Sequence, residues 1–158
     1  MPDLNGAQQR TFFRHFADKR EVLFAGADAD ALRELLVSTV AKAPASLTPI
    51  DAAVAGLRAA GALIQEGGEL ARQRQAIIAS SAELQERELI KLASLATALA
   101  EALRRRGVND PAASLTAEAA IAVFKVAFER YIEETKRQDL PRLIRESLDE
   151  LKAVAAGR

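Results

Sequence analysis

The spacing of apolar residues restricts this chain to helical folds. Apolar residues recur every three or four positions through most of the sequence, as in the series Leu92, Leu95, Leu99 and Leu103. No segment shows the alternation of apolar and polar residues that a half-buried strand requires. Residues 117–128 carry only two charged side chains, so a helix there would be buried on several sides. The pattern predicts an all-α chain of about seven helices.

Start and stop signals mark where several of these helices begin and end. Thr48, Pro49 and Asp51 combine a hydroxyl cap, a proline at the first helical position and an acid in the first turn. The run at residues 104–107, three arginines and a glycine, places cations and then a flexible residue where a helix should end. Such a run also suits nucleic acid, but its position before glycine favours helix termination.

The composition argues against several classes of protein. The 158 residues hold 22 basic and 22 acidic side chains, so no overall field draws the chain onto nucleic acid. Cysteine is absent and histidine occurs once, which excludes a disulfide framework, a thiolate metal site and a histidine-rich metal cluster. No nucleophile, base and orienting group can be assembled, so we expect no enzyme activity, no metal and no cofactor. No apolar run approaches the roughly 18 residues of a membrane span, and no secretory leader is evident, which predicts a cytoplasmic protein.

The most specific motif lies near the N-terminus, in residues 6–23. It reads Gly-Ala-Gln-Gln-Arg-Thr-Phe-Phe-Arg-His-Phe, followed by Ala-Asp-Lys-Arg-Glu-Val-Leu. These residues predict a turn, a short basic and aromatic helix, and a second helix with Asp18 and Glu21 as a capping box. The segment resembles the end of the DNA-binding head of the tetracycline-repressor (TetR) family. There, a recognition helix of the form Arg-Thr-aromatic-aromatic-x-His-Phe precedes a connecting helix that opens with Asp-Lys.

The resemblance implies a set of DNA contacts. A helix in the major groove reads base edges with long polar side chains at its start, and the amides that open the next helix can bind a phosphate. By this resemblance, the DNA-binding residues are Gln8, Gln9, Arg10, Thr11, Phe13, His15 and Lys19. The family often has tyrosine at the position of Phe13, and loss of its hydroxyl bond to the DNA backbone should weaken binding by about 0.5–1.5 kcal/mol.

The resemblance also divides the chain into a short head and a larger body. Residues 1–25 would be a partial helix-turn-helix head, and residues 26–158 a ligand-binding and dimerisation domain. Only nine residues precede Arg10, too few for the two helices that support a recognition helix in the family. A helix of about nine residues is marginal alone. Either the gene starts further upstream or the protein has lost its head, and we expect DNA binding by this chain to be impaired.

The order of helices in the body resembles that of a TetR regulatory domain. This implies an apolar pocket among the central helices and a four-helix dimer interface made by the last two. The candidate pocket residues are Leu63, Ile64, Arg74, Ile77, Ile78, Leu89, Leu92, Phe124 and Phe128. Each apolar residue is more simply interpreted as plain core. Arg74 is more simply a solvated side chain beside Ile77 and Ile78, and contact with an anionic ligand group is the alternative.

The candidate interface residues come from the last two predicted helices. They are Phe128, Tyr131, Leu143, Ile144, Leu148 and Leu151. A monomer could instead fold the closing apolar stripe, residues 140–154, against itself.

These observations predict a TetR-type transcriptional regulator, most simply a repressor. It would act as a homodimer and leave its operator DNA when a small, largely apolar effector binds. Two alternatives remain open. One is a helical homodimer that binds a small molecule or a partner protein without DNA, and the other is a plain helical bundle with no ligand.

Overall fold

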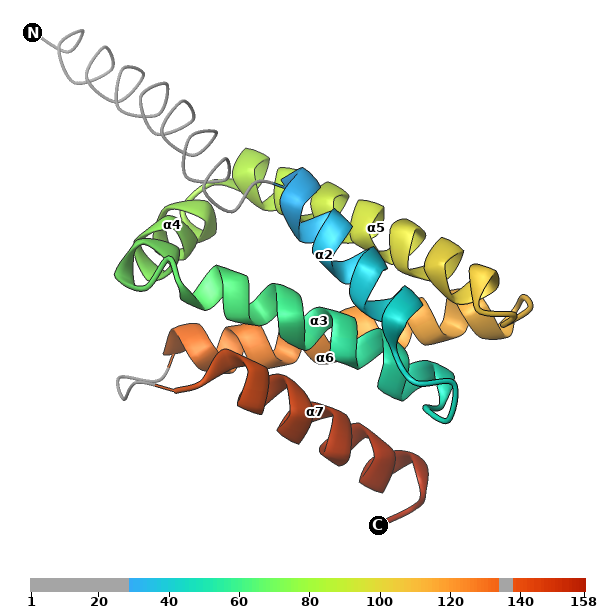
Figure 1. Ribbon diagram of the computed structural model, residues 1–158. Helices are drawn as coiled ribbons and strands as arrows, with labels where there is room; N and C mark the ends of the chain where they lie inside the picture. The colour runs from blue at the N-terminus through green and yellow to red at the C-terminus, as the bar shows by residue number, and fades with distance from the viewer. Residues whose placement is uncertain (1–28, 134–137) are drawn as a thin grey trace, which may run out of the picture.

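The computed structural model describes residues 29–133 and 138–158, which form six α-helices and no strand (Figure 1). The helices are α2 (Ala29–Lys42), α3 (Pro49–Gln65), α4 (Glu69–Ala79), α5 (Ala82–Arg105), α6 (Ala112–Glu133) and α7 (Leu140–Ala155). The predicted all-α fold is confirmed. The motif at residues 6–23, and with it the head predicted for residues 1–25, lies outside the described residues.

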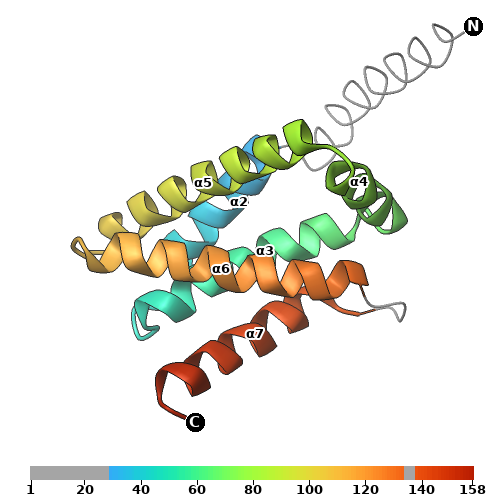
Figure 2. The ribbon, with the colours of Figure 1, turned by 180° about the vertical axis from the view of Figure 1, so that it is seen from behind.

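Helices α3 and α6 occupy the middle of the bundle. Helix α7 packs against both from one side, while α2 and α5 lie on the other side (Figures 1 and 2). Fully buried leucine side chains meet between these layers, among them Leu36, Leu57, Leu99 and Leu103. Each such burial contributes about 1.5–3 kcal/mol, so packing between the helices rather than helix propensity holds the fold.

The predicted start of α3 is confirmed in atomic detail. The Thr48 hydroxyl accepts a hydrogen bond from the Asp51 amide at 3.3 Å, and Pro49 is the first helical residue. This satisfies one of the amides that lack a partner at a helix start. Ser81 caps α5 in the same way, through the Leu84 amide at 3.3 Å.

The run of arginines ends a helix, as the glycine after it suggested. Gly107 has a φ of +95°, which glycine adopts without strain. Arg106 reaches across to the end of α2 and donates hydrogen bonds to the carbonyls of Val40 at 3.0 Å, Ala43 at 2.7 Å and Pro44 at 2.9 Å. The carbonyls at a helix C-terminus have no partner within the helix. Arg106 therefore caps α2 and fastens it to the end of α5.

An ion pair links the start of α3 to the last turn of α7. The Asp51 carboxylate accepts hydrogen bonds from Lys152 Nζ at 2.7 Å and from the Thr48 hydroxyl at 2.8 Å. The bond from Lys152, followed by that from Thr48, holds the pKa of Asp51 below its ordinary value of 3.8. The ionised form of Asp51 is therefore favoured in the folded protein.

This lowered pKa predicts how stability depends on pH. A carboxyl with a lower pKa when folded stabilises the protein above its ordinary pKa, and this stabilisation is lost as the pH falls through the folded value. The substitution Asp51→Asn should lower the free energy of unfolding by about 0.5–1 kcal/mol at pH 7, and the difference from wild type should fade toward pH 2. Urea denaturation at several pH values measures both effects. Asp149→Asn, at an exposed position of α7, is the control and should change the free energy of unfolding by less than about 0.5 kcal/mol.

Two glycines allow α3 to approach its neighbours closely. A Cβ atom at Gly56 would lie 2.8 Å from Leu36 Cδ1 and 3.0 Å from the Leu36 carbonyl oxygen on α2. A Cβ at Gly61 would lie 2.8 Å from Ile144 Cδ1 on α7. The contact at Gly56 therefore involves backbone, whereas the closest contact at Gly61 is the mobile end of a side chain.

Candidate functional site

Several of the predicted pocket residues pack against the hydrophobic core. Ile64, Leu92 and Phe128 are partly buried and pack against the cluster that contains Phe124. The rings of Phe124 and Phe128 stack with centroids 5.9 Å apart and planes 13° from parallel. These residues of α3, α5 and α6 are therefore part of the packed core.

The other predicted pocket residues are spread over different environments. Ile78 on α4 is buried, whereas Leu63 and Ile77 are half-buried. Leu89 on α5 is 56% exposed, so it lies on the surface of the chain and away from this core.

Arg74 on α4 forms an ion pair with Glu88 on α5. The exposed fractions of the two side chains are 14% and 24%, so most of each side chain is removed from solvent. Lys91 Nζ lies 3.9 Å from the same Glu88 oxygen, with 32% of its side chain exposed. Sequence reasoning missed Glu88, which lies 14 residues from Arg74. The available signal was its spacing of four and seven from Leu92 and Leu95, which places it on the inward face of α5.

Helix α4 is the least firmly anchored of the six described helices. It packs chiefly against α5, and Ile78 is its only buried residue among those whose side chains are described. Its N-cap is Gly68, with a φ of +57° and no side-chain hydrogen bond. Leu70 in its first turn is 44% exposed. Figure 2 shows α4 between the end of α3 and the start of α5.

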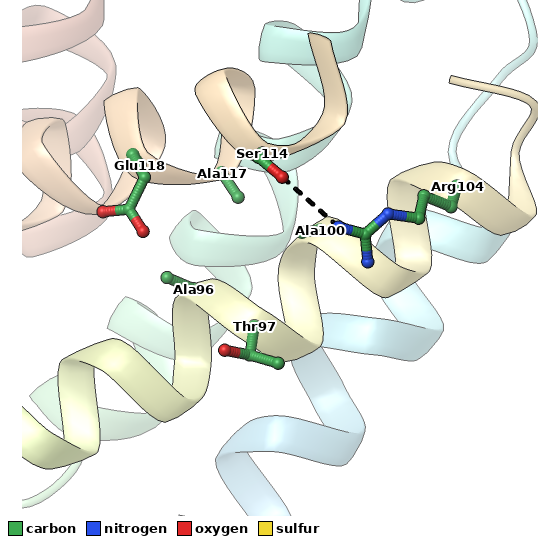
Figure 3. Close-up of a pocket in the computed structure, with 7 residues that line it drawn as sticks. All are labelled: Ala96, Thr97, Ala100, Arg104, Ser114, Ala117 and Glu118. Carbon is green, nitrogen blue, oxygen red and sulfur yellow. Dashed lines mark hydrogen bonds between the residues drawn. The ribbon is translucent and has the colours of Figure 1, made fainter. Parts of the chain in front are cut away.

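A shallow pocket of about 120 Å³ lies in the groove between α5 and α6 (Figure 3). Its lining consists of Ala96, Thr97, Ala100, Arg104, Ser114, Ala117 and Glu118. None of the predicted pocket residues is among them, because the groove depends on how two helices pack and not on an apolar stripe. Pockets for drug-sized ligands measure about 300–1,000 Å³, so this one suits a single side chain or a small ion better than an effector.

The polar end of this groove is closed by a small network. Arg104 donates hydrogen bonds to both oxygens of Asp110, at 2.9 and 3.3 Å, and to the Ser114 hydroxyl at 3.3 Å. Ser114 in turn donates to Asp110 at 2.9 Å. The Arg104 bond, and then that of Ser114, lowers the pKa of Asp110. The network fixes the turn between α5 and α6 and keeps the Arg104 charge paired.

Most of the predicted interface residues are buried within the single chain. Tyr131, Leu143, Ile144 and Leu148 have exposed fractions of 5% or less, because α7 packs its apolar stripe against α3 and α6. Phe128 is half-buried, and Leu151 is 38% exposed.

Two large apolar residues are exposed on the outer face of α6. Leu115 is 66% exposed and Val126 51%, and Ala119 and Ala122 lie between them at helical spacing. These four residues are called the α6 stripe below. Glu118 and Lys125, both exposed, border it.

The candidate DNA contacts, Gln8, Gln9, Arg10, Thr11, Phe13, His15 and Lys19, lie outside the described residues. Within residues 29–133 and 138–158, no group of three or more potential metal ligands comes together. No helix in these ranges is long and apolar enough to span a membrane.

Comparison with known families gives a match over most of the chain. The family model described as the MftR C-terminal domain, a C-terminal domain of TetR-type proteins, matches residues 47–156. This span covers well over half of the 158 residues and contains helices α3 to α7. No curated protein matches the chain.

Proposed function

Because the chain belongs to the TetR family and carries its C-terminal regulatory domain over residues 47–156, we propose that it is a repressor released from DNA by a small, largely apolar effector. The family match is the observation that carries this proposal. The packing of described residues supports it, since α4 is loosely anchored and packs chiefly against α5, the helix that carries Leu92. An effector acts allosterically only if it binds the DNA-free geometry more tightly than the DNA-bound one.

In this proposal, residues 1–25 read the operator and residues 26–158 bind the effector and the second subunit. The operator contacts would be those that the motif implies, with Arg10 as the side chain best suited to a guanine. The effector would lie against the aromatic and aliphatic residues around Phe124, Phe128 and Leu92.

Operator recognition is tested with the full product of the gene and the DNA that flanks it. We expect an electrophoretic mobility shift with this DNA at concentrations that leave unrelated DNA of equal length free. Arg10→Ala should weaken specific binding by about 1–3 kcal/mol, while Arg105→Ala, an exposed change at the end of α5, should not. Equal binding of both DNAs, unchanged by Arg10→Ala, would favour instead a ligand-binding dimer that does not read DNA.

The homodimer common in this family would form across the α6 stripe. Its small central residues, Ala119 and Ala122, allow two helices to approach closely. If two copies of α6 cross antiparallel near Ala122, Glu118 of each meets Lys125 of the other, because the two charges lie on either side of that position. Such a two-fold contact is self-complementary, as homodimer interfaces are.

The predicted interface residues take two roles in this arrangement. Phe128 and Leu151, which are partly exposed, would extend the contact. Tyr131, Leu143, Ile144 and Leu148 would support the interface from inside each subunit.

A further inference from the structure

The ion pair between Arg74 and Glu88 has features of a site that binds an acidic group. Arg74 presents a planar guanidinium, whose paired N–H groups match the two oxygens of a carboxylate or sulfonate. It is 14% exposed, so its charge is partly removed from water but can still be reached. Lys91 also lies near Glu88, so two basic side chains converge on one carboxylate.

The surroundings of the cluster suit an apolar molecule. On α5, Glu88 and Lys91 lie one turn before Leu92 and Leu95, and both leucines pack against the core. On α4, Arg74 lies one turn before Ile78, which is buried. An acidic head at Arg74 would therefore leave the rest of a ligand beside aliphatic side chains.

Helix α4 can move to admit such a ligand at modest cost. Gly67 and Gly68 separate it from α3, and its start has no side-chain cap. It buries few apolar side chains against α5, so the Arg74–Glu88 contact is a main tie between the two helices. Replacing the Glu88 carboxylate by an external one would loosen this tie while keeping the Arg74 charge paired.

We propose that the effector is an apolar molecule with one acidic group, which binds Arg74 in place of Glu88 and separates α4 from α5. This inference rests on the proposed ligand-binding function and adds the chemical class of the ligand. Glu88 acts as an internal competitor that keeps α4 closed in the absence of ligand. Arg74 is then the residue that selects acidic over neutral effectors.

Two fluorescent probes of nearly the same shape test the proposal. The dye 1-anilinonaphthalene-8-sulfonate carries an acidic group, and N-phenyl-1-naphthylamine is the same skeleton without it. We expect the full-length protein to bind the sulfonate more tightly than the neutral probe. Arg74→Gln should weaken sulfonate binding by about tenfold or more and change neutral-probe binding by less than about twofold.

A second substitution removes the competitor and distinguishes binding from misfolding. Glu88→Gln should strengthen sulfonate binding several-fold, a gain that a damaged fold would not produce. Arg87→Gln is the matched control, because Arg87 lies beside Glu88 in sequence but its side chain is 55% exposed and pairs with Glu83. Equal binding of the sulfonate by wild type and Arg74→Gln, or weaker binding by Glu88→Gln, would overturn the proposal.

The same titrations, repeated with operator DNA, separate this inference from the proposed function. Specific DNA binding without Arg74-dependent probe binding would overturn the acidic site and leave the regulator intact. Arg74-dependent probe binding by a protein that does not recognise its operator would support the acidic site and count against the repressor.

Discussion

Replacing Ala122 with glutamate is expected to convert the proposed homodimer into a monomer. In the proposed interface, Ala122 lies close to the two-fold axis, so the substitution would bring two carboxylates together where water is excluded. A buried charge without a partner costs several kcal/mol, and about 4 kcal/mol corresponds to a roughly thousandfold weaker dimer. Light scattering coupled to size-exclusion chromatography measures the change, from about twice the 17.0 kDa chain mass to the chain mass itself.

Controls for this prediction come from other exposed positions and from the charges that border the α6 stripe. Ala62→Glu introduces the same charge at an exposed alanine of α3 and should leave the dimer intact. Glu118→Lys and Lys125→Glu should each weaken the dimer, and the double variant should recover much of the loss. A dimer that survives Ala122→Glu would show that the subunits meet elsewhere.

A valine at Gly56 is expected to lower the free energy of unfolding by about 3 kcal/mol. The first added carbon would already meet Leu36 Cδ1 at 2.8 Å and the Leu36 carbonyl oxygen at 3.0 Å. The carbonyl belongs to the backbone of α2 and cannot rotate away, so the two helices must separate. The midpoint of urea denaturation, measured at one fixed protein concentration because the protein is expected to dimerise, reports the loss.

Alanine substitutions at the two close-approach glycines isolate the cause. Alanine favours a helix over glycine by about 1 kcal/mol, which offsets part of any crowding. At Gly61 the closest neighbour is the Cδ1 atom of Ile144, which can turn aside, so Gly61→Ala should be close to neutral. Gly56→Ala should remain destabilising, by about 1 kcal/mol. Equal effects at both sites would contradict the role given to the α2 backbone.

The helices were predictable from sequence because their signals are local. The cap at Thr48 and the glycine at the end of α5 act within one turn, and both appear where the pattern placed them. The apolar stripe of α7 was also recognisable in the sequence. Its periodicity predicts that one face of the helix is buried, but not which segment packs against that face. In the structure α3 and α6 cover it, so Leu143 and Ile144 are buried within the subunit.

The candidate site was less predictable because it depends on contacts between helices. Arg74 lies on α4 and Glu88 on α5, and the turn at Ser80 separates the two helices. The spacing of residues within one helix therefore cannot predict that these two side chains form an ion pair. The nearly uniform apolar character of α6 correctly indicated burial on several sides. The sequence did not indicate which face of α6 is exposed to solvent. The structure shows that this is the face with Leu115 and Val126, because α3, α5 and α7 cover the other sides.

The three hydrogen bonds from Arg106 to the end of α2 bear on where motion can occur. They lock the far ends of α2 and α5 into one rigid body, at the opposite end of α5 from α4. A movement of α4 is therefore expected to displace the beginnings of α2 and α5, while the ends of these two helices stay fixed at Arg106. The first residues of α2, from Ala29 onward, would therefore move furthest.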